Sequence, residues 1–129
     1  NGGRGLLLLQ KAGLIQLKDG GSDKSTVQDI IANPKNLQIV ELEAAQLPRS
    51  LDDVEAAVIN VNYALEAKLD PSKDALILED KDSPYVNGIV VRKGDENRPE
   101  IKKLVEALQT PEIKQFIQEK YHGAVVPGF

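Results

Sequence analysis

A run of small and branched apolar residues, Ala56 to Ile59, most constrains what this chain can fold into. The run contains no polar residue and stops abruptly at Asn60. A strand with one solvated face alternates between apolar and polar residues, whereas a strand covered on both faces is apolar throughout. The run therefore predicts a buried strand in an α/β protein, with helices packed against a mostly parallel sheet.

The other segments switch between strand-like and helical patterns in the same way. Strands are predicted at residues 37–42, 75–78 and 85–92, which are rich in branched residues. Ser25 and Gln28 have the spacing of a capping box, which predicts a short helix that begins at Ser25 and ends at Asn33 before Pro34. Further helices are predicted where apolar residues recur at helical spacing or a proline suits the first turn, at residues 6–13, 47–53, 62–68, 99–108 and from 110 onward.

Composition excludes several classes of protein. A hydrophobic fraction of 41% and a charged fraction of 28% are typical of a globular chain, and no apolar run approaches the roughly 20 residues of a membrane span. The net charge of -4 argues against a nucleic-acid partner. Without cysteine, and with His122 as the single histidine, thiolate and all-histidine metal sites are excluded. We expect no metal and no cofactor, and a surface or capping role for His122.

The sequence offers no catalytic residues. None of the five serines lies in a G-x-S-x-G elbow, and only one histidine is available as a base. The acidic pairs, such as Asp52 and Asp53, are adjacent in the sequence and are typical of a solvated face. The chain is therefore not expected to be an enzyme.

The segment from Asn1 to Arg4 is the first candidate binding site. Gly2 and Gly3 leave backbone amides open at the start of a predicted helix, where the dipole is positive. The planar guanidinium of Arg4 matches a carboxylate. The alternative is that the two glycines form a turn and Arg4 is a solvated helix charge.

Asn60 is the second candidate, because ligands of open α/β sheets bind beyond the carboxyl ends of strands. Its side chain offers an acceptor and two donors, which suit an amino-acid ammonium or carboxylate. Its alternative role is to cap the helix predicted at residues 62–68. Tyr85 and Asn87 share one face of the strand at residues 85–92 and could line a cleft, or form the polar face of an edge strand.

Several strings of the sequence together resemble the NlpA family, the methionine-binding lipoproteins of bacterial ABC importers. The similarity extends from the N-x-x-R segment at Asn1 to the Gly-Ala-Val tail that begins at Gly123, so it covers essentially the whole chain. The longest matching strings are LLLLQKxGLI from Leu6, NPKNL from Asn33, IVELEAxQLPRS from Ile39, AVINxNYA from Ala57 and EDKDSPYVN from Glu79.

The resemblance implies a type II periplasmic-binding-protein fold, with two lobes of mostly parallel sheet joined by two crossing strands. Such a protein closes on a free amino acid and delivers it to the permease and ATPase of an importer. By resemblance, Arg4 takes the ligand carboxylate with Asn1 beside it. Asn60 and Asn87 hold the head group, and Tyr85 is a lining or hinge residue.

The resemblance also implies that this chain corresponds to the C-terminal half of a longer protein. Residues 1–82 would be an incomplete second lobe. Residues 83–129 would be a crossing strand with the C-terminal helical segment of the first lobe. The missing N-terminal half, which is an expected partner, would carry the lipidated cysteine that anchors the protein to the membrane outside the cytoplasm. The chain is then a proteolytic remnant, a deliberately shortened chain, or one of two separate chains.

The function implied is binding of methionine, or of a methionine-containing dipeptide, in an amino-acid ABC importer. The alternative is the ligand-sensing effector domain of a transcription regulator, because the same fold serves there. An enzyme on the same scaffold is a third hypothesis, which lacks a visible catalytic constellation.

Overall fold

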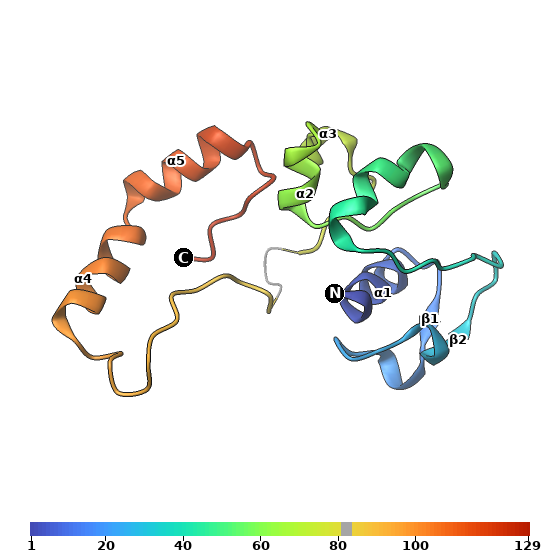
Figure 1. Ribbon diagram of the computed structural model, residues 1–129, viewed down its shortest axis with the longest axis horizontal. Helices are drawn as coiled ribbons and strands as arrows, with labels where there is room; N and C mark the ends of the chain where they lie inside the picture. Colours follow the sequence, from blue (N-terminus) through green and yellow to red (C-terminus); the bar gives the residue numbers. More distant parts are fainter. Residues whose placement is uncertain (81–83) are drawn as a thin grey trace. The chain divides into compact units, whose positions relative to one another are not determined.

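The computed structural model describes residues 1–80 and 84–129, which form two compact units (Figure 1). Unit 1 comprises Asn1–Asp70 and Asp74–Leu78, and unit 2 comprises Pro71–Lys73 and Glu79–Phe129. The domain boundary predicted between residues 82 and 83 lies outside the described residues. It therefore stays a prediction.

Short helical elements make up most of the regular structure in both units (Figure 1). Along Asn1–Asp70 the order is α1 (Gly2–Lys11), β1 (Gln16–Leu17), η1 (Lys18–Gly20), η2 (Val27–Asp29), β2 (Ile30–Ala32), η3 (Ala44–Asp53) and α2 (Val61–Glu66). Then follow α3 (Pro71–Asp74), α4 (Pro99–Leu108) and α5 (Pro111–Tyr121). None of the described helices is long and apolar enough to cross a membrane.

The hydrophobic core of unit 1 forms where α1 packs on the small sheet. Leu6, Ile15 and Leu17 are buried in it. Partly buried side chains from α1, β2 and the segment after it pack around them, namely Leu7, Leu9, Ile30, Leu37 and Ile39. The leucines of α1 thus pack against the small sheet and the segment after it.

Two side-chain amides fasten the segments around this core. The Nε2 group of Gln10 donates to the carbonyl of Gly20 at 2.8 Å, and its Oε1 accepts from the amide of Leu17 at 2.7 Å. Asn33 in the same way binds both the carbonyl and the amide of Leu37, each at 2.9 Å. These bonds satisfy backbone groups that have no partner in a helix or sheet ladder.

The strands differ from the prediction. The sheet of the described residues is an antiparallel pair of β1 and β2, with Gln16 opposite Ala32. The strands predicted at residues 37–42, 56–59, 75–78 and 85–92 are wrong for this structure, because these segments form no ladder. A strand is stable only beside another strand, and no neighbouring strand for these segments occurs among the described residues.

The helix ends follow the sequence more closely. Pro99 begins α4, and the Oγ1 of Thr110 accepts from the amide of Ile113 at 3.3 Å at the start of α5. His122 ends α5 in the left-handed conformation, with φ of 47°, so its capping role is confirmed. The capping box predicted at Ser25 is one residue off, because it is Thr26 whose amide donates to Asp29 Oδ2, at 2.8 Å.

Candidate functional site

The first turn of α1 carries two of the predicted ligand residues. Asn1 is the exposed N-cap, and its side chain makes no capping hydrogen bond. Arg4 is half-buried one turn into the helix. The first turn contains no acidic residue, so its own side chains do not offset the positive end of the dipole.

One carboxylate from elsewhere in unit 1 lies against this helix end. A Cβ added at Gly2 would lie 2.9 Å from Oε1 of Glu41, so that carboxylate contacts the first turn of α1. A negative charge near a helix N-terminus is favourable. Sequence reasoning missed Glu41; the only available signal was the absence of an acidic residue at the start of the helix.

The segment that ends in Asn60 lies beside the same turn. A Cβ added at Gly5 would lie 3.7 Å from Cγ1 of Val58, an ordinary van der Waals distance. Asn60 itself is half-buried at the N-cap of α2, where its carbonyl accepts from the amide of Ala64 at 3.1 Å. Its side chain makes no capping hydrogen bond, so Asn60 caps α2 through its backbone and not through its side chain. Unit 1 therefore brings together the segments that bear Arg4 and Asn60.

Tyr85 and Asn87 belong to unit 2 and are exposed, with Tyr85 37% accessible. Because residues 85–92 form no ladder, the shared strand face predicted for these two side chains is not formed. The segment lies beside the C-terminal tail instead, since a Cβ added at Gly128 would be 3.3 Å from Cγ1 of Val86. Convergence of Asn87 and Tyr85 with Arg4 and Asn60 stays a prediction.

A shallow depression of about 530 Å³ lies elsewhere in unit 1, among Gln10, Gly13, Ile15, Leu17 and Pro34. None of the predicted ligand residues lines it. Its wall is formed by the end of α1 and the two strands, and no charged residue lines it. The depression therefore offers no counter-charge for the head group of an amino acid.

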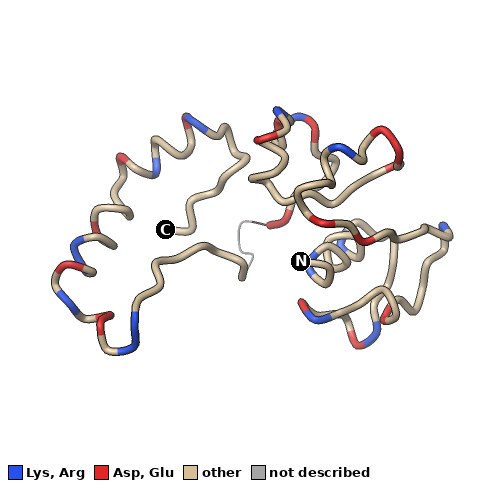
Figure 2. Tube along the Cα trace, viewed as in Figure 1, with Lys and Arg blue, Asp and Glu red and all other residues tan. Residues whose placement is uncertain are grey.

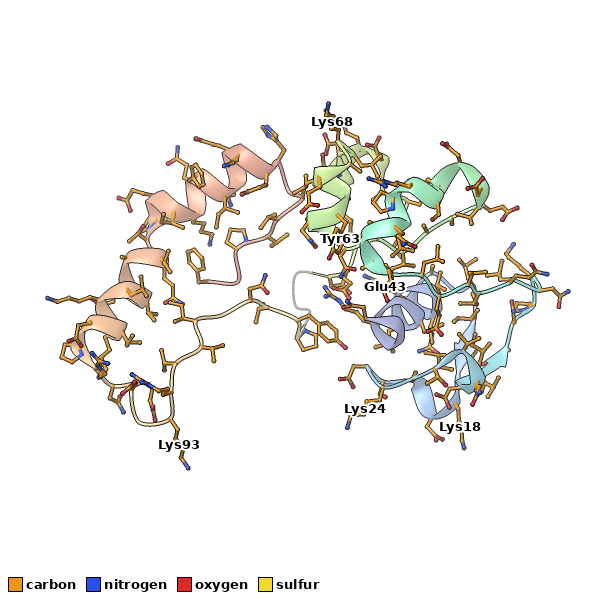
Figure 3. The ribbon with its side chains drawn as sticks, viewed as in Figure 1. Lys18, Lys24, Glu43, Tyr63, Lys68 and Lys93 are labelled. Carbon is orange, nitrogen blue, oxygen red and sulfur yellow. The ribbon has the colours of Figure 1, made fainter. Side chains whose placement is uncertain are left out.

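Charges of both signs alternate along the trace (Figure 2). Figure 3 shows the side chains of Lys18 and Lys24 pointing away from the core of unit 1. Among the residues that the structure describes, no group of three or more His, Cys, Asp or Glu side chains could hold a metal ion. The first turn of α1 and its surroundings therefore offer a guanidinium, backbone amides and neutral side-chain amides, together with the carboxylate of Glu41.

Comparison with known families decides which fold these segments belong to. The NlpA lipoprotein family matches residues 1–129, the whole chain. The chain belongs to the NlpA lipoprotein family. The resemblance predicted from the strings of its sequence is thereby confirmed.

Relatives of this NlpA-family chain include D-methionine-binding lipoproteins. That of Salmonella typhi is 53% identical over 131 residues, and that of Escherichia coli strain K12 is 52% identical over 131 residues. Each alignment covers 100% of this chain and 48% of the relative. The chain thus spans about half the length of the curated relatives it matches.

Solved structures confirm the fold class. A nutrient-binding protein from Burkholderia cenocepacia bound to methionine is 55% identical, with a TM-score of 0.90 over 100% of this chain and 55% of that one. A periplasmic substrate-binding protein of an ABC transporter from Coxiella burnetii is 50% identical, with a TM-score of 0.87 over 96% of this chain and 52% of that one. The NlpA-family chain therefore has part of a substrate-binding-protein fold.

Proposed function

We propose that this chain is the C-terminal half of a solute-binding protein that binds methionine for an ABC importer. The observation that carries the proposal is the match of the entire chain, at 55% identity, to a nutrient-binding protein bound to methionine. Relatives named D-methionine-binding lipoproteins, 52% and 53% identical, support the same ligand. A methionine-containing dipeptide is the next candidate ligand. Binding and release without chemical change is the proposed activity, so no catalytic residue is needed.

In the proposed site, polar side chains of this chain hold the charged end of the ligand. Arg4 pairs with the ligand carboxylate at the first turn of α1, and Asn1 lies beside it. Asn60 and Asn87 hold the amino-acid head group through their side-chain amides, and Tyr85 lines the site. Two observations support this assignment: Arg4 is half-buried, and the side chain of Asn60 makes no capping hydrogen bond to α2.

The partners of the complete protein follow from the same family. It delivers its ligand to the permease and ATPase of the importer and works outside the cytoplasm, held at the membrane by a lipid anchor. The N-terminal half completes the protein. The relatives named above are lipoproteins, so nothing described here favours the alternative of a transcription-regulator effector domain.

Calorimetry on the full-length protein tests the assignment of Arg4. The Arg4→Ala variant leaves the ligand carboxylate without its counter-charge, so we expect methionine binding to weaken by about 2 to 5 kcal/mol. Arg92→Ala is the matched control, since it removes the same charge from a side chain that is 87% exposed and paired only at the surface with Asp95. Unchanged affinity in Arg4→Ala would refute the assignment.

A further inference from the structure

Asn87 is followed directly by Gly88. In such a pair the backbone nitrogen of the second residue can attack Cγ, the carbonyl carbon of the asparagine side chain. The attack requires the backbone to turn the two atoms together, and glycine allows this turn most easily because it has no Cβ. The pair is therefore a candidate for chemical modification of a residue that the proposed function places at the ligand.

The surroundings of this pair leave the turn open to it. Asn87 and Gly88 are exposed, in a segment that forms no helix or strand (Figure 1). Within the described part of the chain, the amide of Gly88 and the side chain of Asn87 make no hydrogen bond. A Cβ added at Gly88 would meet none of the described residues within 4 Å. Both the attacking nitrogen and the side chain that it attacks are thus available.

The same pair of residue types occurs at Asn1 and Gly2, but there the backbone is held. Gly2 is the first residue of α1, and the carbonyl of Asn1 accepts from the amide of Gly5 at 3.0 Å. A Cβ added at Gly2 would lie 2.9 Å from Oε1 of Glu41, so the space beside it is also occupied. A backbone fixed at helical angles cannot turn the nitrogen of Gly2 onto the side chain of Asn1.

Each remaining asparagine precedes a nitrogen that lacks a proton, is already hydrogen-bonded or belongs to a helix. These pairs are Asn33–Pro34, Asn36–Leu37, Asn60–Val61, Asn62–Tyr63 and Asn97–Arg98. Asn97 is the best comparison with Asn87, because it is also exposed and lies in a turn of the same unit. The amide of Arg98, however, donates to the carbonyl of Asp95 at 3.1 Å.

We propose that Asn87 is a site of deamidation through a succinimide. The nitrogen of Gly88 loses its proton and forms a bond to Cγ of Asn87. The bond between Cγ and Nδ2 breaks, and the side-chain nitrogen leaves as ammonia. Water then opens the ring at either carbonyl, which gives aspartate or isoaspartate. Water is the only reactant besides the chain itself, and no oxidant or reductant takes part.

The consequence for the ligand rests on the proposed function, in which the amide of Asn87 holds the head group. Aspartate has no donor to offer at pH 7, and its negative charge repels a ligand carboxylate. Isoaspartate carries the same charge and also lengthens the backbone, so its carboxylate is displaced. Deamidation therefore removes methionine binding, and bound methionine in turn slows deamidation by holding the amide.

Peptide mapping by mass spectrometry tests the modification in the 129-residue chain kept at mildly alkaline pH. The nitrogen attacks after losing its proton, so the rate should rise with pH. We expect Asn87 to be converted at least about tenfold faster than Asn97, because only Asn87 precedes glycine. Isoaspartate at residue 87 should also accept a methyl group from an isoaspartyl methyltransferase. Equal rates at the two asparagines would overturn the proposal.

Gly88→Ala is the matched variant. Gly88 is not among the residues with positive φ, and its Cβ would meet none of the described residues, so alanine fits there without strain. The added methyl group restricts the turn and should slow conversion of Asn87 by at least about tenfold. An unchanged rate in this variant would contradict attack by the nitrogen of residue 88.

Methionine added to the full-length protein separates this inference from the proposed function. We expect it to slow conversion of Asn87 and not of Asn97, and the number of methionine sites measured by calorimetry should fall in step with the converted fraction. If Asn87 is converted while methionine neither slows the conversion nor loses sites, the ligand role of Asn87 is wrong and the modification site stands. If Asn87 stays intact in the 129-residue chain while Asn87→Asp abolishes binding in the full-length protein, the ligand role stands and the modification is overturned.

Discussion

Gly3 is the residue where α1 approaches its neighbouring loop most closely. It is buried, and a Cβ added there would overlap the backbone carbonyl of Asp23. Backbone cannot move aside as the end of a flexible side chain can. The first turn of α1, which carries the proposed carboxylate site, therefore packs this closely on the loop only because residue 3 has no side chain.

We expect Gly3→Ala to destabilise unit 1 by about 1 to 3 kcal/mol, because overpacking outweighs the better helix propensity of alanine. The free energy of opening from hydrogen exchange at α1 amides measures it. Gly5→Ala is the control, since its Cβ would meet Val58 at an ordinary 3.7 Å and should stabilise the helix by at most about 1 kcal/mol. A Gly3→Ala variant as stable as the parent chain would show that the loop at Asp23 moves to accommodate the added methyl group.

At the residue scale the sequence predicted local chemistry well. Thr110 caps the start of α5, and His122 caps its end as expected, because capping depends on a few adjacent residues. The one-residue error at Thr26 arose because Ser25 and Gln28 offer the same spacing as Thr26 and Asp29. The spacing alone could not choose between two overlapping pairs.

Among the elements, the connection from β2 to the following segment depends on one side chain. Asn33 binds both the amide and the carbonyl of Leu37, and this positions Leu37 and Ile39 against the core. Asn36 lies within the turn at a positive φ of 52°, a conformation that asparagine tolerates better than most residues. The side chain of Asn33 therefore positions this segment through the backbone of Leu37, as the hydrogen bonds of a ladder position a strand in a sheet.

Asn33→Ala removes two part-buried hydrogen bonds, and we expect a loss of about 1 to 3 kcal/mol in the stability of unit 1. Urea unfolding followed at the Leu37 amide by hydrogen exchange measures the loss. The exposed neighbour Lys35 provides the control, because Lys35→Ala should change stability by less than about 0.5 kcal/mol. Equal stability of the two variants would mean that water replaces the two hydrogen bonds of the Asn33 side chain.

Strands were the elements that the sequence could not place. Residues 37–40 alternate between half-buried and exposed side chains, as the pattern predicts, yet no ladder forms there. Residues 56–59 are as apolar as a strand covered on both faces, but have no strand beside them among the described residues. The alternation of apolar and polar side chains depends on the segment itself. A ladder also requires a second strand beside that segment, and the pattern of one segment does not show whether such a strand is present.

Across the whole molecule, the proposed ligand residues are divided between the two units. Asn1, Arg4 and Asn60 belong to unit 1, and Tyr85 and Asn87 belong to unit 2. Within unit 1 the segment that bears Asn60 lies beside α1, since a Cβ added at Gly5 would lie 3.7 Å from Val58, and the shared ligand role of the first group stays a prediction. Strand topology, on which the prediction for the second group rested, did not form.

We therefore expect the 129-residue chain alone to bind methionine weakly or not at all. A small ligand gains at most about 1.5 kcal/mol per non-hydrogen atom, and only when nearly all of its surface is enclosed. Isothermal titration calorimetry of the chain, beside the full-length protein as the positive control, measures the difference. Affinity within tenfold of the full-length protein would show that these residues form a sufficient site by themselves.

The hydrogen bond from Lys11 Nζ to the carbonyl of Leu78, 3.3 Å long, joins residues 67 positions apart. It ties the last segment of unit 1 back to its first helix. The chain thus returns to α1 before the long segment of unit 2 begins at Glu79. A polypeptide that ended at residue 78 would therefore contain every segment of unit 1, including both partners of this hydrogen bond.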